Sequence, residues 1–423
     1  MEQGKWGLRL MQVFAGRRAP HHALKAGRSG ERMRYQILDG FRGFFLIFMF
    51  IAHANEQLKT LIGKYSHHNF GWVEDAQGFV FISGLVIGLV YGKRLLRQGV
   101  NSMHLALINR QKTIYIYYIF IILSLYFIYI IVDGHTRSEI LLSYREGSWR
   151  YILTSMMLLS ASKFMDILPM YLVFMAFTGL ALNAMSKGRE ALVLAISALM
   201  WVMAQSHGYD AILLAIREQA AGLLGGPIGE SPHFDLFGWQ FIYFLGLYLG
   251  FRMARNDLDL SFMKTRTGSE IALFCFVSIM LFLIFKRMSF ASWLDPEYVK
   301  MIRLHQVRSI LSPVYLFAFL VDLYLLTWLI VAGVDSGNKA VRFVGSKVKL
   351  LFSSKPLVFL GQHSLQVYSF HIILVYLISI ILDGQPVGQL RGFAIIFLGI
   401  ALLYGVAYLH DKWSHWSKPV LAS

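Results

Sequence analysis

Apolar stretches of about twenty residues recur along the whole chain, and they limit its possible folds more than any other feature. Backbone groups in lipid must bond to one another, so each stretch is expected to be a helix. The pattern therefore predicts an all-α polytopic integral membrane protein with about ten transmembrane helices. The predicted spans are residues 37–57, 76–96, 112–132, 167–186, 190–206, 237–253, 270–286, 311–332, 357–381 and 391–410.

The balance of charge supports a membrane location and argues against a nucleic-acid partner. Only 15% of the residues are charged, against about 25% in soluble domains. The net charge is +16, but the basic residues gather in short segments between apolar stretches. This distribution is typical of membrane topology and of contact with anionic lipids. The single cysteine, Cys275, excludes an internal disulfide, and no metal site is predicted.

The positions of the lysine and arginine residues also predict the orientation of the chain in the membrane and its division into domains. Most of them fall in segments that are cytoplasmic if both termini are inside, as the positive-inside rule requires. A basic loop with Lys300, Arg303 and Arg308 would then lie outside, either as an outer binding surface or as an exception to the rule. Residues 1–34 are predicted to be a weakly structured, basic cytoplasmic arm, and residues 35–423 the transmembrane domain. The longest loops, about 133–166 and 207–236, are expected to face outward and to shape an entrance.

The first predicted span, LDGFRGFFLIFMFIAHANEQ, carries ionisable residues on one face. Arg42 and His53 are eleven residues apart, so on a helix they differ by three turns plus ~20° and lie ~16 Å apart along the axis. Asp39 lies three residues before Arg42 and Glu56 three residues after His53, on nearly the same face. Such residues at membrane depth normally face the interior of a bundle and mark a functional path.

This stripe favours one task in particular. With the N-terminus inside, Arg42 lies near the cytoplasmic leaflet and His53 in the outer half of the membrane. An anionic carrier could enter from the cytoplasm and present its reactive end to an acceptor from the other side. The simpler interpretations are a salt bridge between Asp39 and a snorkelling Arg42, and a hydrogen bond from His53 to another helix.

Five blocks of sequence resemble the OpgC family within the membrane acyltransferase-3 superfamily, in the family's order: LDGFRGFFLIFMFIAH, NFGWVEDAQGFVFISGLVIGLVYGKRL, FMDILPMYLVF, FDLFGWQFIYFLGLYLG and LVFLGQHSLQVYSFH. The resemblance implies a ten-helix acyltransferase of the bacterial inner membrane. It would move a succinyl group from cytoplasmic succinyl-CoA, or another acyl-CoA, to a hydroxyl of a periplasmic glucan, with no permanently bound cofactor. It also implies that His53 is the catalytic residue and Arg42 its motif partner.

Acids and aromatic residues are expected around the outer end of this path. Glu74 and Asp75 begin the second span, and either could orient His53 or bind the acceptor, or simply stabilise a helix start. Asp166 precedes Pro169 and is interpreted as an acceptor-site acid or an N-cap. Trp239 and Gln240 are a candidate sugar platform or part of an interfacial aromatic belt.

Basic and small residues are expected to hold the donor on the cytoplasmic side. Arg94, Arg110 and Lys112 are candidates for binding the coenzyme's phosphates, although positive-inside charge alone explains them. Ser83 lies on a face of small residues that could admit a slender ligand arm or pack closely against another helix. His371 in a later span is either a second polar group of the core or a helix-to-helix bond.

The predicted mechanism uses His53 as general base on the acceptor hydroxyl, with Asp75 or Glu56 holding its ring. An acyl-histidine intermediate is the alternative. A different class of function, an ion-coupled transporter or flippase for an anionic metabolite or a lipid-linked sugar, would also use intramembrane charges. The sequence shows no inverted repeat that would favour transport. A scaffold protein without chemistry would leave the polar stripe unexplained, and the oligomeric state is not indicated.

Overall fold

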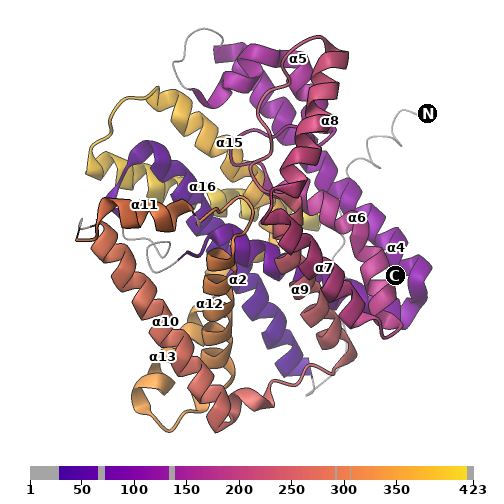
Figure 1. Cartoon of the computed structure of the whole chain (residues 1–423), viewed down its shortest axis with the longest axis vertical. Helices are drawn as coiled ribbons and strands as arrows, with labels where there is room; N and C mark the ends of the chain where they lie inside the picture. Colours follow the sequence, from indigo (N-terminus) through magenta and orange to yellow (C-terminus); the bar gives the residue numbers. More distant parts are fainter. Residues whose placement is uncertain (1–27, 65–71, 133–138, 291–292, 305, 417–423) are drawn as a thin grey trace.

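The computed structural model describes residues 28–64, 72–132, 139–290, 293–304 and 306–416, and every regular element in them is a helix (Figure 1). Seven helices are long and apolar enough to cross a membrane, or up to eight if one bent pair forms a single span. The predicted all-α membrane fold is therefore confirmed, whereas the count of ten spans is not. The seven are Gln36–Leu58, Asp75–Val132, Ile167–Ser186, Arg266–Ser289, Pro313–Val331, Ser364–Leu382 and Gln389–Ser414.

Helix α4, Asp75–Val132, explains part of the difference in count. It contains two predicted spans in one helix of 58 residues, interrupted at Gly99, where φ is +83°. A straight helix of that length would extend ~87 Å, about three times the ~30 Å of a hydrocarbon core. Glycine adopts positive φ without steric cost, so Gly99 provides the bend that lets the two halves run as separate passes.

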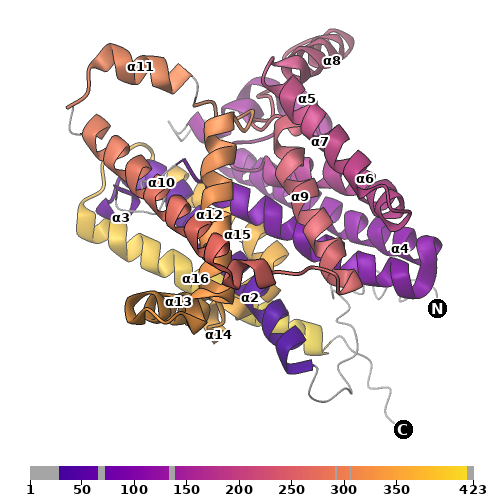
Figure 2. The same cartoon turned by 60° about the horizontal axis from the view of Figure 1, so that its bottom comes forward.

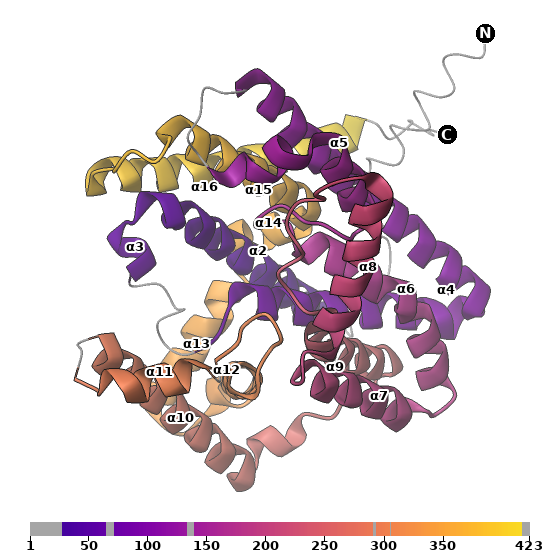
Figure 3. The same ribbon diagram turned by 45° about the horizontal axis from the view of Figure 1, so that its top comes forward.

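Helix α2, Arg28–Leu58, lies near the middle of the bundle, with α15 and α16 on one side (Figure 3). It begins before the boundary predicted at residue 35, so residues 28–34 are helical and not weakly structured as predicted. Glu, Arg and Met there are good helix formers, and the helix simply continues toward the N-terminus. The rest of the predicted arm, residues 1–27, lies outside the described residues.

The stretch predicted as one span at 357–381 is two helices, α14 (Lys355–Gln362) and α15 (Ser364–Leu382), separated at His363. Three glycines bring α14 into backbone contact with α2. A Cβ at Gly40 or Gly43 would collide with a carbonyl of the segment that ends α13 and begins α14, and one at Gly361 would collide with the carbonyl of Asp39. This close approach places α14 beside the half of α2 that carries Arg42.

The small-residue face of α4 packs against α9, Leu236–Arg255, in the same way. A Cβ at Gly84 or Gly88 would collide with the α9 backbone, and one at Gly246 or Gly250 would collide with the α4 backbone. The simpler interpretation of these glycines, close helix packing, is therefore confirmed. Helix α9 is not among the seven candidate spans.

The two segments predicted as long outward loops contain helices. The first holds η2 (Glu139–Leu141) and α5 (Leu142–Met156), and the second holds α8 (Gly208–Leu224). Helix α8 follows α7 (Glu190–Ala204) across a bend of 73°. Helix α8 is mostly exposed, since Leu213 is its only buried residue.

The remaining elements form a side arm and a C-terminal pair (Figures 1 and 2). Helix α6 (Ile167–Ser186) leads from the first outer segment into the bundle, and α16 (Gln389–Trp416) packs along α15. The arm comprises η3 (Ser261–Lys264), α10 (Arg266–Phe290), α11 (Pro296–Leu304), α12 (Pro313–Val331), η4 (Gly333–Asp335) and α13 (Lys339–Phe352), and α3 is a single turn at Leu61–Lys64.

The two ends of the helical region meet at one end of the bundle. Gly361 touches Asp39 near the start of α2, and His363 bonds to His410 near the end of α16, with Nδ1 atoms 2.9 Å apart. This arrangement agrees with termini on the same side of a membrane. The side itself, predicted as cytoplasmic, stays a prediction.

Candidate active site

A cavity of about 930 Å³ at the C-terminal end of α2 is the main candidate site. Its volume is in the range of pockets that hold small organic ligands. Lys163 and Glu56 line it with side chains 51% and 45% exposed, so the cavity reaches the protein surface. The polar residues that line it are His53, Glu56, Gln57, Glu74, Asp75, Ser162, Lys163, Asp166, Glu230, Ser231, His233, Arg308 and Asp383.

His53 is held between an aromatic ring and a second histidine. Its ring stacks on Phe164, with centroids 4.2 Å apart and planes inclined by 23°. Its Nδ1 lies 3.2 Å from Nε2 of His371, and Nδ1 of His371 lies 2.6 Å from the carbonyl oxygen of Tyr368. His371 is fully buried on α15, so one helix fixes the edge of the His53 ring while Phe164 covers its face.

Phe164 belongs to a short segment that α15 holds in place. Its φ of +70° is a left-handed conformation that non-glycine residues seldom adopt. The Tyr368 hydroxyl donates to the Phe164 carbonyl at 3.1 Å, and the Tyr376 hydroxyl donates to the Lys163 carbonyl at 3.2 Å. Lys163 also pairs with Glu56 of α2, with Nζ and Oε2 2.5 Å apart. These contacts stabilise the backbone that puts the Phe164 ring on His53.

The start of α4 contributes two acids to the cavity. The Gln77 side chain accepts a hydrogen bond from the Glu74 backbone N–H at 2.8 Å, as in a capping box, which fixes the helix start. Asp75 is 2% exposed, whereas the Glu74 carboxylate faces Arg308 at 3.7 Å. The basic outer loop predicted around Arg308 therefore does bring one cation to the site. The Arg308 guanidinium also lies 3.2 Å from Nε2 of His233.

Asp166 connects the two segments that are predicted to face outward. It occupies the N-cap position of α6, as predicted, but its backbone angles are helical and its side chain makes no cap hydrogen bond. Its Oδ1 instead accepts the backbone N–H of His233 at 2.7 Å. Burial raises the pKa of Asp166 to about 6, and burial followed by the charge of Arg308 lowers the pKa of His233. As predicted, residues from both outer segments line the cavity.

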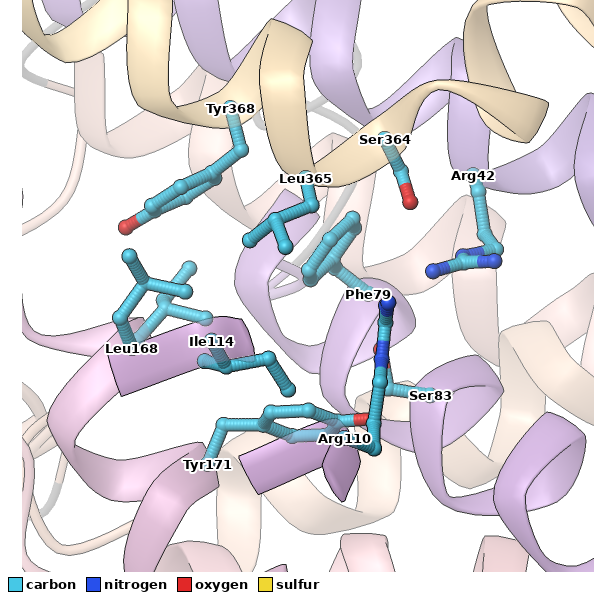
Figure 4. Close-up of a pocket in the computed structure, with 11 residues that line it drawn as sticks. Arg42, Phe79, Ser83, Arg110, Ile114, Leu168, Tyr171, Ser364, Leu365 and Tyr368 are labelled. Atoms are coloured by element: carbon cyan, nitrogen blue, oxygen red, sulfur yellow. The ribbon is translucent and has the colours of Figure 1, made fainter. Parts of the chain in front are cut away.

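A second, small cavity of about 30 Å³ contains Arg42, with room for about one water molecule. Arg42 shares it with Ser83 and Arg110, both predicted to contact the donor, and pairs with Asp39 at 3.9 Å. Figure 4 shows the two arginines on one side and Leu168 and Tyr368 on the other. Ile167 lines both cavities, so the two cavities are neighbours that share a wall residue.

Five predicted site residues lie outside both cavities, and one of them, Asp39, contacts the small cavity through its pair with Arg42. Arg94 bonds to Ser102 near the bend of α4, with Nε and Oγ 2.9 Å apart, and Lys112 is exposed. Trp239 is buried and donates to the carbonyl of Ser309 at 2.9 Å. Gln240 is buried against Ser197, whose hydroxyl donates to it at 2.6 Å. These positions give Arg94, Lys112, Trp239 and Gln240 packing or surface roles, and a sugar platform or phosphate site at them has no geometric support.

Sequence reasoning did not assign Phe164, Lys163 or Tyr368 to the site. Phe164 and Lys163 follow an apolar stretch that gives no sign of a left-handed residue, and Tyr368 looks like one more aromatic of an apolar helix. His371 offered a signal, because it is an ionisable residue in the middle of a span. Nothing in the sequence indicates that it meets His53.

In a comparison with protein families, residues 34–415 match the family described as "OpgC protein". The match includes every residue that lines the two cavities. Comparisons with curated proteins and with solved structures gave no match.

Proposed function

The chain belongs to the OpgC family and is thus a multi-pass membrane protein of acyltransferase type, and on this premise we propose that it is a transmembrane O-acyltransferase of the bacterial inner membrane. The donor would be a cytoplasmic acyl-CoA, with succinyl as the acyl group that the family resemblance implies. The acceptor would be a hydroxyl of a periplasmic glucan. No permanently bound cofactor is needed, because the coenzyme thioester is itself a substrate.

One observation carries the proposal: His53 and Arg42 project from the same helix into two cavities that share Ile167 as a wall residue. A base in a large cavity that reaches the surface suits an incoming hydroxyl. Two arginines in a narrow cavity below it suit a slender anionic donor. Acyl transfer from one side of a membrane to the other requires that the donor cavity with its arginines and the acceptor cavity with its base lie next to each other along one path.

The chemistry assigned to His53 is general base catalysis. As the hydroxyl oxygen attacks the thioester carbonyl, its proton moves to His53, and a new C–O bond forms. The C–S bond then breaks, the coenzyme thiolate takes the proton from His53, and the ester remains on the glucan. Proton transfer of this kind contributes ~10²–10⁴-fold to rate. A covalent acyl-histidine route would use the same residue with acylation at its ring.

Arg42 and Arg110 would guide the donor. Arginine binds phosphates and carboxylates through paired N–H groups, so these residues could contact the coenzyme or the carboxylate of a succinyl group. The cavity of about 30 Å³ holds no acyl-pantetheine arm as it stands. For the donor to reach His53, the side chains of Ile167, Phe79 and Tyr368 would therefore have to move apart.

Thiol release by purified protein in lipid nanodiscs tests the proposal. With succinyl-CoA and an osmoregulated glucan added, we expect coenzyme release and a mass increase of the glucan, and loss of both in His53→Ala. The control is His363→Ala, which removes another buried histidine that lines neither cavity. Full activity in His53→Ala would contradict the mechanism.

The same preparation separates the enzyme from the rival function. A transporter or flippase would move a labelled anion or lipid-linked sugar across proteoliposomes and would release no thiol. Mass spectrometry of periplasmic glucans from a deletion strain gives the independent answer in cells. Unmodified glucans in that strain, restored by the wild-type gene but not by His53→Ala, support acyl transfer.

A further inference from the structure

The contact between His53 and His371 carries chemical information because a backbone carbonyl fixes one of its hydrogens. Nδ1 of His371 lies 2.6 Å from the carbonyl oxygen of Tyr368, three residues earlier on α15. A carbonyl oxygen can only accept a hydrogen bond, so the His371 Nδ1 must carry the hydrogen. In neutral imidazole the other nitrogen is then an acceptor. For His371 that nitrogen is Nε2, the atom 3.2 Å from Nδ1 of His53.

We infer that His371 is a positioning residue that fixes His53 as the tautomer with hydrogen on Nδ1 and the basic lone pair on Nε2. The hydrogen in the contact between the two rings can come only from His53, because Nε2 of His371 has none. The inference rests on the proposed function, in which His53 takes a proton from the acceptor. It adds the atom that takes it, Nε2, and the residue that makes this atom the base.

The opposite tautomer of His53 is disfavoured on physical grounds. It would place two nitrogen lone pairs 3.2 Å apart and leave both without a hydrogen. His371 is fully buried, and a buried acceptor left unsatisfied costs about 1–3 kcal/mol. Because about 1.4 kcal/mol is a factor of ten, this corresponds to a roughly 5- to 150-fold preference for the tautomer with hydrogen on Nδ1.

The contact also suits the charged intermediate. When His53 takes the proton of the hydroxyl, both of its nitrogens carry hydrogen, and Nδ1 still donates to His371. Neutral His371 therefore stabilises the imidazolium without competing for the proton. Phe164 stacks on the ring at 4.2 Å and limits its rotation, so the bond to His371 selects one of few orientations.

Two substitutions with opposite geometry test this inference. In His371→Gln, the amide lies near the position of the original Nε2 and offers an oxygen acceptor to His53. In His371→Asn, the shorter amide lies near the position of Nδ1 and keeps a donor for the Tyr368 carbonyl, with no acceptor for His53. We expect the Gln variant to keep kcat within a few-fold and the Asn variant to lose ~10²-fold, with KM for donor and acceptor unchanged in both.

His363→Gln and His363→Asn are the matched controls, since His363 is also buried and also pairs with a histidine, His410, at 2.9 Å. We expect this second pair of variants to differ little from each other in kcat. Thermal unfolding in detergent shows whether each variant is folded. If Asn and Gln at position 371 are equally active, or if Asn is the better of the two, the positioning role is wrong.

These outcomes differ from a failure of the proposed function. If His53→Ala keeps full acyl transfer, the function assigned to His53 fails and His371 has nothing to position. If His53→Ala is inactive while all folded His371 variants match the wild type, the transferase stands and only the inference falls. A parallel loss of folding in the Asn variant but not in His363→Asn would assign His371 a purely structural role and overturn the inference.

Discussion

Arg42 and His53 project from one helix but line separate cavities of about 30 and 930 Å³, and Ile167 belongs to the wall of both. In the proposed function, an acyl chain that passes from Arg42 to His53 has to move the Ile167 side chain, because it lines both cavities. The small cavity is therefore the place where a change in side-chain volume is expected to affect donor use and little else.

Ser83→Leu should impair use of the acyl donor. Ser83 is 4% exposed and lines the small cavity, so a larger side chain there fills space that the pantetheine arm needs. We expect kcat/KM for the donor to fall at least ~10-fold, while KM for the glucan stays the same, as steady-state kinetics can measure. Overpacking of this kind also costs about 1–3 kcal/mol of stability.

Ser278→Leu separates these two effects. Ser278 is also buried, at 8% exposure, but it lies on α10, and its hydroxyl donates to the Phe274 carbonyl away from both cavities. It should show a similar loss of thermal stability with nearly normal donor kinetics. Equal kinetic losses in the two variants would mean that the small cavity is not on the donor path.

Arg110→Ala and Arg94→Ala should differ, although the sequence placed both residues in one phosphate site. Arg110 lines the small cavity, whereas Arg94 bonds to Ser102 near the bend of α4. A hydrogen bond to a charged group contributes about 1.5–3 kcal/mol, so Arg110→Ala should raise donor KM by roughly 10–100-fold. Arg94→Ala should leave it near normal. Similar KM values for the two variants would remove Arg110 from the donor site.

Much of the candidate site could be predicted from sequence, because a helix has a known repeat. The spacing of Arg42 and His53 was enough to place both in the interior, and the acids Asp75, Glu74 and Asp166 fell beside the same cavity. These residues stand out because charge is costly at membrane depth. A charged residue in an apolar span can therefore be identified as a functional candidate from the sequence alone, without knowledge of the fold.

The contacts that hold these residues could not be predicted in the same way. The pairing of His371 with His53 joins positions 318 residues apart, and no local pattern encodes it. Trp239 and Gln240 carry the chemistry of a sugar site, yet their side chains face carbonyls and Ser197 inside the bundle. Their orientation depends on how α9 rotates when its glycines pack against α4, which is a tertiary property.

Asp166→Asn should change how stability depends on pH. The pKa of Asp166 is about 6, against 3.8 for an ordinary aspartate, so the folded protein holds this proton more tightly than the unfolded chain. Its contribution to stability is fully present below about pH 4 and is lost as the pH rises through 6. Asparagine keeps an oxygen for the His233 N–H and never ionises.

Thermal unfolding in detergent between pH 4 and pH 8 checks this expectation. The Asn variant should be more stable than the wild type at pH 8, by up to about 3 kcal/mol for two pKa units, and equal to it at pH 4. Asp235, whose pKa burial also raises to about 6, is present in both proteins and cancels in the comparison. An advantage that is the same at both pH values would show that Asp166 does not titrate in this range.

Arg308→Gln should weaken the acceptor site, whereas Lys300→Gln should not. Both cations belong to the basic loop region that is predicted to lie outside. Arg308 lines the large cavity and faces Glu74, whereas Lys300 lies on α11 beside Glu297 at 4.0 Å. Loss of one hydrogen-bonding group in a binding site costs about 1 kcal/mol, so KM for the glucan should rise roughly fivefold in Arg308→Gln with donor KM unchanged. The Arg308 and Glu74 side chains are 45% and 26% exposed, so their coupling in a double-mutant cycle with Glu74→Gln should be below about 1 kcal/mol. An increase in glucan KM for Lys300→Gln as large as that for Arg308→Gln would indicate that the acceptor is recognised by general surface charge and not by the cavity.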